Sequence, residues 1–112
     1  MKPVLAALLV LGLLQGCASG PSISSAGRSG QAFAQKTCSR CHAIGAQGAS
    51  PKPHATPFRE IAQRYDDRTL ASEFDALARM GHYEMPPLTI SAPDRRALSA
   101  YIGSFRAPEE GR

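Results

Sequence analysis

The stretch Cys38-Ser39-Arg40-Cys41-His42 places two thiols and an imidazole within five residues of a chain that has 112 residues and three cysteines. Upstream, Ser29 can cap a helix that runs from about Gln31 to about Cys38, because its hydroxyl can accept a hydrogen bond from an amide of the first turn. Downstream, residues 43–55 are rich in Gly, Pro and small side chains and show no hydrophobic period, which indicates a loop. We therefore expect the stretch where a helix ends and a loop begins.

The spacing Cys-x-x-Cys-His is the signature of covalent attachment of c-type haem. Its physical reason is that the thiols of Cys38 and Cys41 add to two vinyl groups on one side of the porphyrin, which brings the adjacent imidazole of His42 to the iron. A thioredoxin-like redox pair is one alternative, but it needs a βαβ context and no strand is predicted before the motif. A structural zinc site is another, but it needs four ligands, and His54 and His82 each stand alone in the sequence.

The N-terminus has the layout of an export signal, because Met1-Lys2-Pro3 precedes an uncharged apolar run of 11 residues, 4–14. As a helix this run would reach about 17 Å, which is too short for a hydrocarbon core of about 30 Å. A short membrane anchor or a buried helix is the alternative. The junction Leu14-Gln15-Gly16-Cys17 resembles a bacterial lipobox, in which cleavage precedes a cysteine that carries a diacylglycerol. Gln15 is less usual there than a small residue, so ordinary cleavage nearby is the other option.

These features divide the chain into four parts. They are a lipoprotein-type signal peptide (1–16), lipidated Cys17 with a flexible linker (17–28), one globular domain (29–107) and a C-terminal tail (108–112). The Gly, Ser and Pro content of the linker favours an unfolded segment. In a Gram-negative host, the absence of aspartate at Ala18 is typical of lipoproteins of the outer membrane. We therefore expect an exported protein on the periplasmic side of a bacterial membrane, anchored through lipid on Cys17.

The globular part is small, with about 80 residues, no Trp and few large apolar side chains. A domain of this size usually needs disulfides, a metal or a large cofactor to complete its core. Thiols normally pair in an oxidising compartment, but the number of cysteines is odd; lipid on Cys17 and haem on Cys38 and Cys41 would use all three. The net charge of +4 is mild and does not favour nucleic acid as a partner.

Three further helices are predicted and no segment has a strand pattern, so the expected fold class is all-α. In the first helix, Thr56 is the N-cap and Pro57 takes the first helical position. In the second, apolar residues recur at helical spacing up to Met80, and Gly81 is placed to end the helix. In the third, Ser91 opens a pattern with capping-box-like spacing. The expected ranges are 57–65, 69–80 and 91–105.

Gly30, Phe33, the Cys-x-x-Cys-His stretch, a later Met-Pro pair and Tyr101 in a C-terminal helix together resemble the small class I c-type cytochromes, which carry one haem. The resemblance covers about residues 29–106. It implies a cytochrome c-like fold of three to five helices around one haem c, with the first and last helices crossing near Gly30, Phe33 and Tyr101. It also implies a one-electron carrier rather than an enzyme, with redox proteins as donor and acceptor.

In such cytochromes a methionine from a loop near the C-terminus is the second axial ligand, and Met85, followed by Pro86 and Pro87, matches it. A thioether is a soft neutral ligand suited to iron, and a proline-flanked loop can hold it rigidly. Met80 is the rival, although its place at the end of a predicted helix favours a core methionine. Ligation by His82, which would give a bis-histidine haem, and an open site are the remaining alternatives.

A backbone carbonyl is expected to accept the free ring N–H of His42 and orient the ring. Family geometry places a proline of the following loop there, and the candidates are Pro51, Pro53 and Pro57. His54 is expected to be solvated or near a haem propionate. Basic residues that could pair with propionates, or be solvated instead, are Arg40, Lys52 and Arg59.

Occupation of both axial positions by His42 and Met85 would leave the iron no site for a substrate, which predicts outer-sphere electron transfer in an exported chain. Two other classes remain open. One is a haem-based gas sensor or haem enzyme, in which Met85 leaves the iron. The other is an accessory haem subunit of an exported oxidoreductase.

Overall fold

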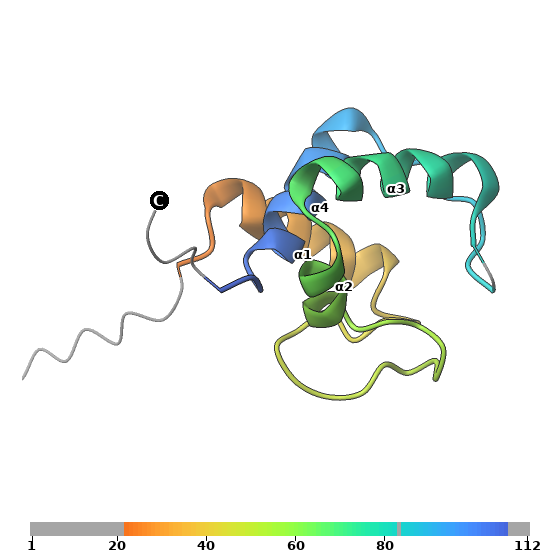
Figure 1. The fold of residues 1–112 in the computed structure, drawn as a ribbon, viewed down its shortest axis with the longest axis horizontal. Helices are drawn as coiled ribbons and strands as arrows, with labels where there is room; N and C mark the ends of the chain where they lie inside the picture. The colour runs from red at the N-terminus through yellow and green to blue at the C-terminus, as the bar shows by residue number, and fades with distance from the viewer. Residues whose placement is uncertain (1–21, 83, 108–112) are drawn as a thin grey trace, which may run out of the picture.

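The computed structural model describes residues 22–82 and 84–107, which form four helices (Figure 1). They are α1 (Ser25–Thr37), α2 (Phe58–Arg64), α3 (Asp67–Met80) and α4 (Ala92–Gly103). This part of the chain contains no strand beyond an isolated bridge between His82 and Met85, so the predicted all-α fold is confirmed. None of the described helices is both long and apolar enough to cross a membrane. The expected signal peptide, Cys17 and the tail 108–112 lie outside the described residues.

Helix α1 begins earlier than predicted. Its cap is Ser24, whose Oγ accepts from the Gly27 amide at 3.0 Å, so the assignment of Ser29 as the cap is wrong. Ser29 lies inside the helix and donates to a carbonyl one turn earlier at 3.3 Å. Residues 25–28, expected in the linker, therefore form the first turn. Packing explains the difference, because Gly27 is buried and faces the Ala100 carbonyl of α4, so α4 covers this turn as well.

Helices α1 and α4 make the most extensive helix contact and cross each other (Figure 1). Gly30 of α1 lies at the crossing, against the backbone of α4. A Cβ on Gly30 would overlap the Ala97 carbonyl and lie 2.9 Å from the Leu98 amide nitrogen, so only glycine allows this approach. Tyr101 is buried beside the crossing and Phe33 is half-buried against the same core. The expected crossing of the first and last helices is therefore confirmed.

The caps of the later helices agree only in part with the prediction. Ser91 caps α4 as expected, accepting from an amide three residues later at 3.2 Å, although the helix ends at Gly103 rather than near residue 105. Asp66 caps α3 by accepting from the Thr69 amide at 2.8 Å, so α3 begins before residue 69. This hydrogen bond lowers the pKa of the Asp66 carboxyl. Helix α2 has no side-chain cap, and the expected cap by Thr56 is wrong.

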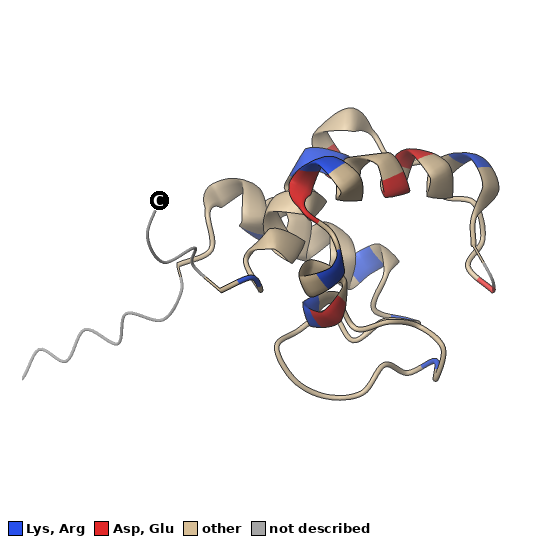
Figure 2. Cartoon of the chain, in the orientation of Figure 1, with Lys and Arg blue, Asp and Glu red and all other residues tan. Residues whose placement is uncertain are grey.

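Arg106, which follows α4, ties the C-terminal end of the domain to the corner between α2 and α3. Its Nε donates to the Ala62 carbonyl at 3.0 Å and its Nη2 to the Tyr65 carbonyl at 2.7 Å. Its Nη1 pairs with Asp67 at 2.6 Å. Figure 2 shows that α3 carries charges of both signs along its length. Arg106 thus fixes the start of α3, which forms one wall of the site described below.

We expect Arg106→Ala to lower the free energy of unfolding by about 1–3 kcal/mol, because backbone carbonyls in a partly buried corner lose their donors. The matched control is Arg95→Ala, which breaks only the pair between Arg95 and Asp75 at 2.9 Å. That partly exposed pair should contribute less than about 1 kcal/mol. Denaturant unfolding measures both variants, and an equal loss of the free energy of unfolding in the two would contradict the role given to Arg106.

Candidate functional site

A cavity of about 460 Å³ lies between α2, α3, α4 and the segments that flank α2 and α3. Its volume falls within the range of about 300–1,000 Å³ that is usual for sites of small molecules and cofactors. Its wall is mainly apolar, and seven of the lining residues belong to the buried core: Cys38, Phe58, Leu70, Phe74, Ile90, Leu98 and Ile102. The core residues therefore surround a space instead of closing on one another, as the small apolar content of the domain led us to expect.

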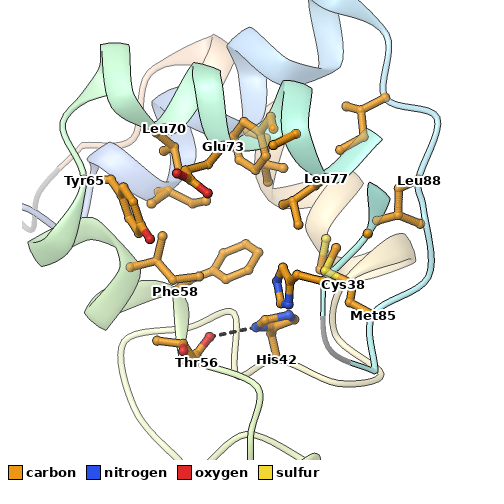
Figure 3. A pocket seen from close by; sticks show the side chains of 18 of the residues that line it. Cys38, His42, Thr56, Phe58, Tyr65, Leu70, Glu73, Leu77, Met85 and Leu88 are labelled. Carbon is orange, nitrogen blue, oxygen red and sulfur yellow. Dashed lines mark hydrogen bonds between the residues drawn. The ribbon is translucent and has the colours of Figure 1, made fainter. Parts of the chain in front are cut away.

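The Cys-x-x-Cys-His stretch lies at one end of this cavity. Helix α1 ends at Thr37, and the chain then turns so that the His42 amide donates to the Cys38 carbonyl at 2.9 Å. Cys38 and His42 are each only 8% exposed and line the cavity, whereas Cys41 is half-buried and lines a smaller cleft of about 90 Å³ next to it. Figure 3 shows Cys38, His42 and Met85 at this end of the cavity and Tyr65 and Leu70 at the opposite end.

The His42 ring is held by one hydrogen bond, between Nδ1 and the Thr56 carbonyl at 2.7 Å (Figure 3). A carbonyl can only accept, so Nδ1 carries the proton and, in the neutral ring, Nε2 keeps a free lone pair. The expected carbonyl partner is therefore confirmed, but it comes from Thr56 and from none of the three candidate prolines. Pro57 contributes indirectly, because the residue before a proline favours extended backbone.

The loop that supplies Thr56 is tied to the motif at several points. The Lys52 amide donates to the Cys41 carbonyl at 3.1 Å, and the Phe58 amide donates to the Ala43 carbonyl at 2.9 Å. The Ala43 amide in turn donates to a serine hydroxyl of the loop at 2.9 Å. Tyr101 of α4 donates to the Ile44 carbonyl at 2.7 Å. These bonds fix the loop on both sides of His42 and so hold the Thr56 carbonyl at the ring.

The two candidate methionines differ in their surroundings. Met85 is half-buried and lines both the main cavity and the smaller cleft, which it shares with His42. Met80 also lines the main cavity but is 74% exposed, so its assignment as a core methionine is wrong. The reason is that the last turn of α3 extends past the core, which α3 meets through Leu70 and Phe74. His82 is exposed, although like Met85 it lines both the main cavity and the smaller cleft.

Comparison with known families adds a sequence match to this geometry. Residues 25–102 match the family model described as "Cytochrome C oxidase, cbb3-type, subunit III". The chain belongs to this family. Its match begins at the first residue of α1 and ends within α4, so it covers all four described helices. Neither the curated proteins nor the solved structures with which the chain was compared include a match.

As a cytochrome c domain, the chain binds one haem c covalently through Cys38 and Cys41. The residues present fit this group. The cavity offers apolar walls for the macrocycle, a buried thiol and a neighbouring half-buried thiol for its attachment, and an imidazole whose Nε2 has a free lone pair. Bound haem would also give the apolar residues of this small domain the additional apolar surface that they need to form a core.

The Cys38 thiol does not have the property expected of a reactive thiol in a redox pair. Burial, with a smaller contribution from the nearby Cys41, raises the pKa of the Cys38 thiol to about 11. Reactive thiols of redox motifs instead have pKa values lowered to about 3.5–7.5, because only the thiolate is nucleophilic.

A zinc site gains no support either, since the described residues contain no group of three His, Cys, Asp or Glu side chains placed to bind a metal ion.

The charged residues around the cytochrome c site agree only in part with those expected from the sequence. Arg64 and Glu73 line the main cavity and were not predicted to do so, although Arg64 lies one helical turn after Ile61, which also lines it. Lys52 lines the smaller cleft, and Arg59 borders a separate cleft in the loop. His54 lines these two clefts, and Arg40 is exposed and lines none of the three spaces.

Proposed function

We propose that this cytochrome c domain is a monohaem one-electron carrier of an exported electron transfer chain, in which His42 and Met85 are the axial ligands of the iron. When bound, haem c supplies reversible one-electron chemistry between Fe(III) and Fe(II). The observation that carries the proposal is the hydrogen bond from His42 Nδ1 to the Thr56 carbonyl, which leaves Nε2 as the ligand atom. Met85, which borders the same cavity and shares the smaller cleft with His42, would supply the opposite ligand.

The protein side chains have distinct tasks in this proposal. The Thr56 carbonyl orients the His42 ring and increases its basicity as a ligand. The thioether of Met85 raises the reduction potential relative to a site with a second histidine. The apolar side chains keep most of the site dry, and two occupied axial positions leave no coordination site for a substrate. The arrangement therefore favours transfer of an electron over chemistry on a bound molecule.

We expect Met85→Ala to retain covalent haem but to lose the low-spin six-coordinate spectrum and the weak far-red band of ferric iron bound by methionine sulfur. The matched control is the same substitution at Met80, which is 74% exposed and should leave the spectrum unchanged. Visible absorption spectra of the oxidised proteins measure both effects. Equal loss in the two variants would refute the assignment, and loss in His82→Ala alone would indicate a bis-histidine site.

The same preparation separates a carrier from a gas sensor. With Met85 on the iron, the reduced protein should not bind carbon monoxide at neutral pH without denaturant. Binding under those conditions would show that Met85 leaves the iron readily, and a sensor or haem enzyme would then replace the carrier as the favoured function.

A second candidate function is that of a haem-bearing subunit of a terminal oxidase, and the description of the matched family favours it. The two functions differ in how the protein associates. A subunit should copurify with an oxidase in fixed proportion from detergent-solubilised membranes, even at high salt. A carrier should separate from its partners and exchange between them, because transient redox complexes are small and polar.

The proposal also includes export and a lipid tether at Cys17, so that the domain would work on the periplasmic side of a bacterial membrane, with the outer membrane as one location. The basis is the sequence alone: the apolar run 4–14, the lipobox-like junction before Cys17 and the short segment that joins it to α1. Redox proteins would be its electron donor and acceptor.

A further inference from the structure

Gly81 ends α3 with a backbone conformation that side chains disfavour. Its amide donates to the Leu77 carbonyl at 2.9 Å, and its φ and ψ are 63° and −170°. This combination of positive φ and extended ψ is adopted almost only by glycine, and another residue there is strained. The direction in which the chain leaves α3 therefore depends on glycine at this position.

The segment that carries Met85 occupies the space where a side chain on residue 81 would lie. A Cβ on Gly81 would be 2.5 Å from the Met85 carbonyl oxygen, 3.0 Å from the Pro87 nitrogen and 3.1 Å from the Pro86 carbonyl carbon. All three are backbone atoms, which cannot move aside by a change of rotamer. The proline rings further restrict the chain, because each fixes its own φ.

The same segment is also paired with the residue after Gly81. The Met85 amide donates to the His82 carbonyl at 2.7 Å, and the His82 amide donates to the Met85 carbonyl at 3.3 Å. His82 and Met85 are thus paired through their backbones, and the Met85 carbonyl lies against Gly81. A displacement at Gly81 must move Met85 or break the pairing of His82 with Met85.

We propose that Gly81 is a positioning residue for the axial ligand Met85, an inference that rests on the proposed ligation by Met85. The absence of a side chain at residue 81 lets the Met85 backbone approach the end of α3, which sets how far the sulfur reaches into the cavity. A Cβ needs at least about 3.0 Å from the oxygen that now lies 2.5 Å from its ideal position, so a shift of about 0.5 Å is required. A shift of that size reaches the limit of about 0.5 Å within which a preorganised site must be held.

A purely structural role for Gly81, as a helix stop, makes a different prediction. It would lower the stability of every variant with strain at this position but leave the ligand on the iron in the folded protein. Gly48 is the matched control, because its φ of 88° is also positive while no atom lies within 4 Å of its would-be Cβ. Alanine there introduces backbone strain without crowding.

The test compares Gly81→Ala, Gly48→Ala and Met85→Ala as exported proteins with covalent haem. We expect Gly81→Ala to lose most of the far-red band and to have a midpoint potential lowered towards that of Met85→Ala. Gly48→Ala should keep the band intensity and the midpoint potential of the original protein. A full band and an unchanged potential in Gly81→Ala would overturn the inference. Retention of the band in Met85→Ala would instead refute the proposed ligation itself, which keeps the two failures distinct.

Gly81→Asn is the second variant, to be used if Gly81→Ala does not accumulate. Asparagine adopts positive φ more readily than alanine, although mainly with a helical ψ, and it still carries a Cβ, so it should lose the band as well. If neither variant accumulates, amide hydrogen exchange in the original loaded protein decides. Protection of the Met85 amide comparable to that of Leu77 within α3 would support the inference, and exchange as fast as in the loop residues 45–49 would overturn it.

Discussion

Replacement of both Cys38 and Cys41 by alanine is expected to abolish the stable fold of the protein as well as the covalent attachment of haem. Without attached haem, the apolar residues around the cavity of about 460 Å³ lose the body they enclose. At about 24 cal/mol per Å³ of unfilled cavity, this corresponds to at most about 11 kcal/mol, which is comparable with the total stability of about 5–15 kcal/mol of a small domain. Circular dichroism and denaturant unfolding should show no cooperative transition.

The control for this experiment is Arg40→Ala, which changes an exposed residue between the two cysteines and keeps both thiols. It should yield covalent haem and unfold as the original protein does. A double cysteine variant that is free of haem, folded and cooperative would contradict the view that the cofactor completes the core.

Gly30→Ala is expected to lower the free energy of unfolding by about 3 kcal/mol or more, the upper end of the usual cost of overpacking. The new methyl group would meet the Ala97 and Leu98 backbone of α4, which cannot rotate away, so α1 and α4 must separate. Alanine gains about 1 kcal/mol in helix propensity over glycine, which is too little to offset this separation. Denaturant unfolding of the loaded protein measures the change.

Gly45→Ala serves as its control, because no atom lies within 4 Å of a Cβ at Gly45. Its free energy of unfolding should stay within about 0.5 kcal/mol of the original value. A similar small change in Gly30→Ala would mean that the two helices do not depend on close contact at this crossing.

The helical fold and the attachment motif could be predicted because both are local patterns. The Cys-x-x-Cys-His stretch is contiguous, the stop at Gly81 and the cap at Ser91 each follow from a few neighbouring residues, and α3 shows its period in Leu70, Phe74 and Leu77. The start of α1 could not be predicted from such a pattern. Several serines precede the helix, and contact with α4, far along the chain, decides which of them is the cap.

The parts of the site that sequence reasoning missed depend on long-range contacts. Thr56 lies 14 residues from His42 in a loop with several prolines, and only the folded loop shows which carbonyl reaches the ring. Met80 has the spacing of a core residue but lies where α3 extends past the core. Arg106 reaches back about 40 residues to the corner of α2 and α3. A short sequence pattern cannot predict contacts between residues that lie so far apart along the chain.

The most direct test of the central claim is the visible spectrum of the exported wild-type protein from a host that matures c-type cytochromes, recorded oxidised and reduced and extended into the far red. Ligation by His42 and Met85 predicts a c-type reduced spectrum and, in the oxidised protein, the weak far-red band of methionine sulfur on ferric iron. Covalent haem without that band would contradict the account, because the sixth position would then be open or held by another histidine.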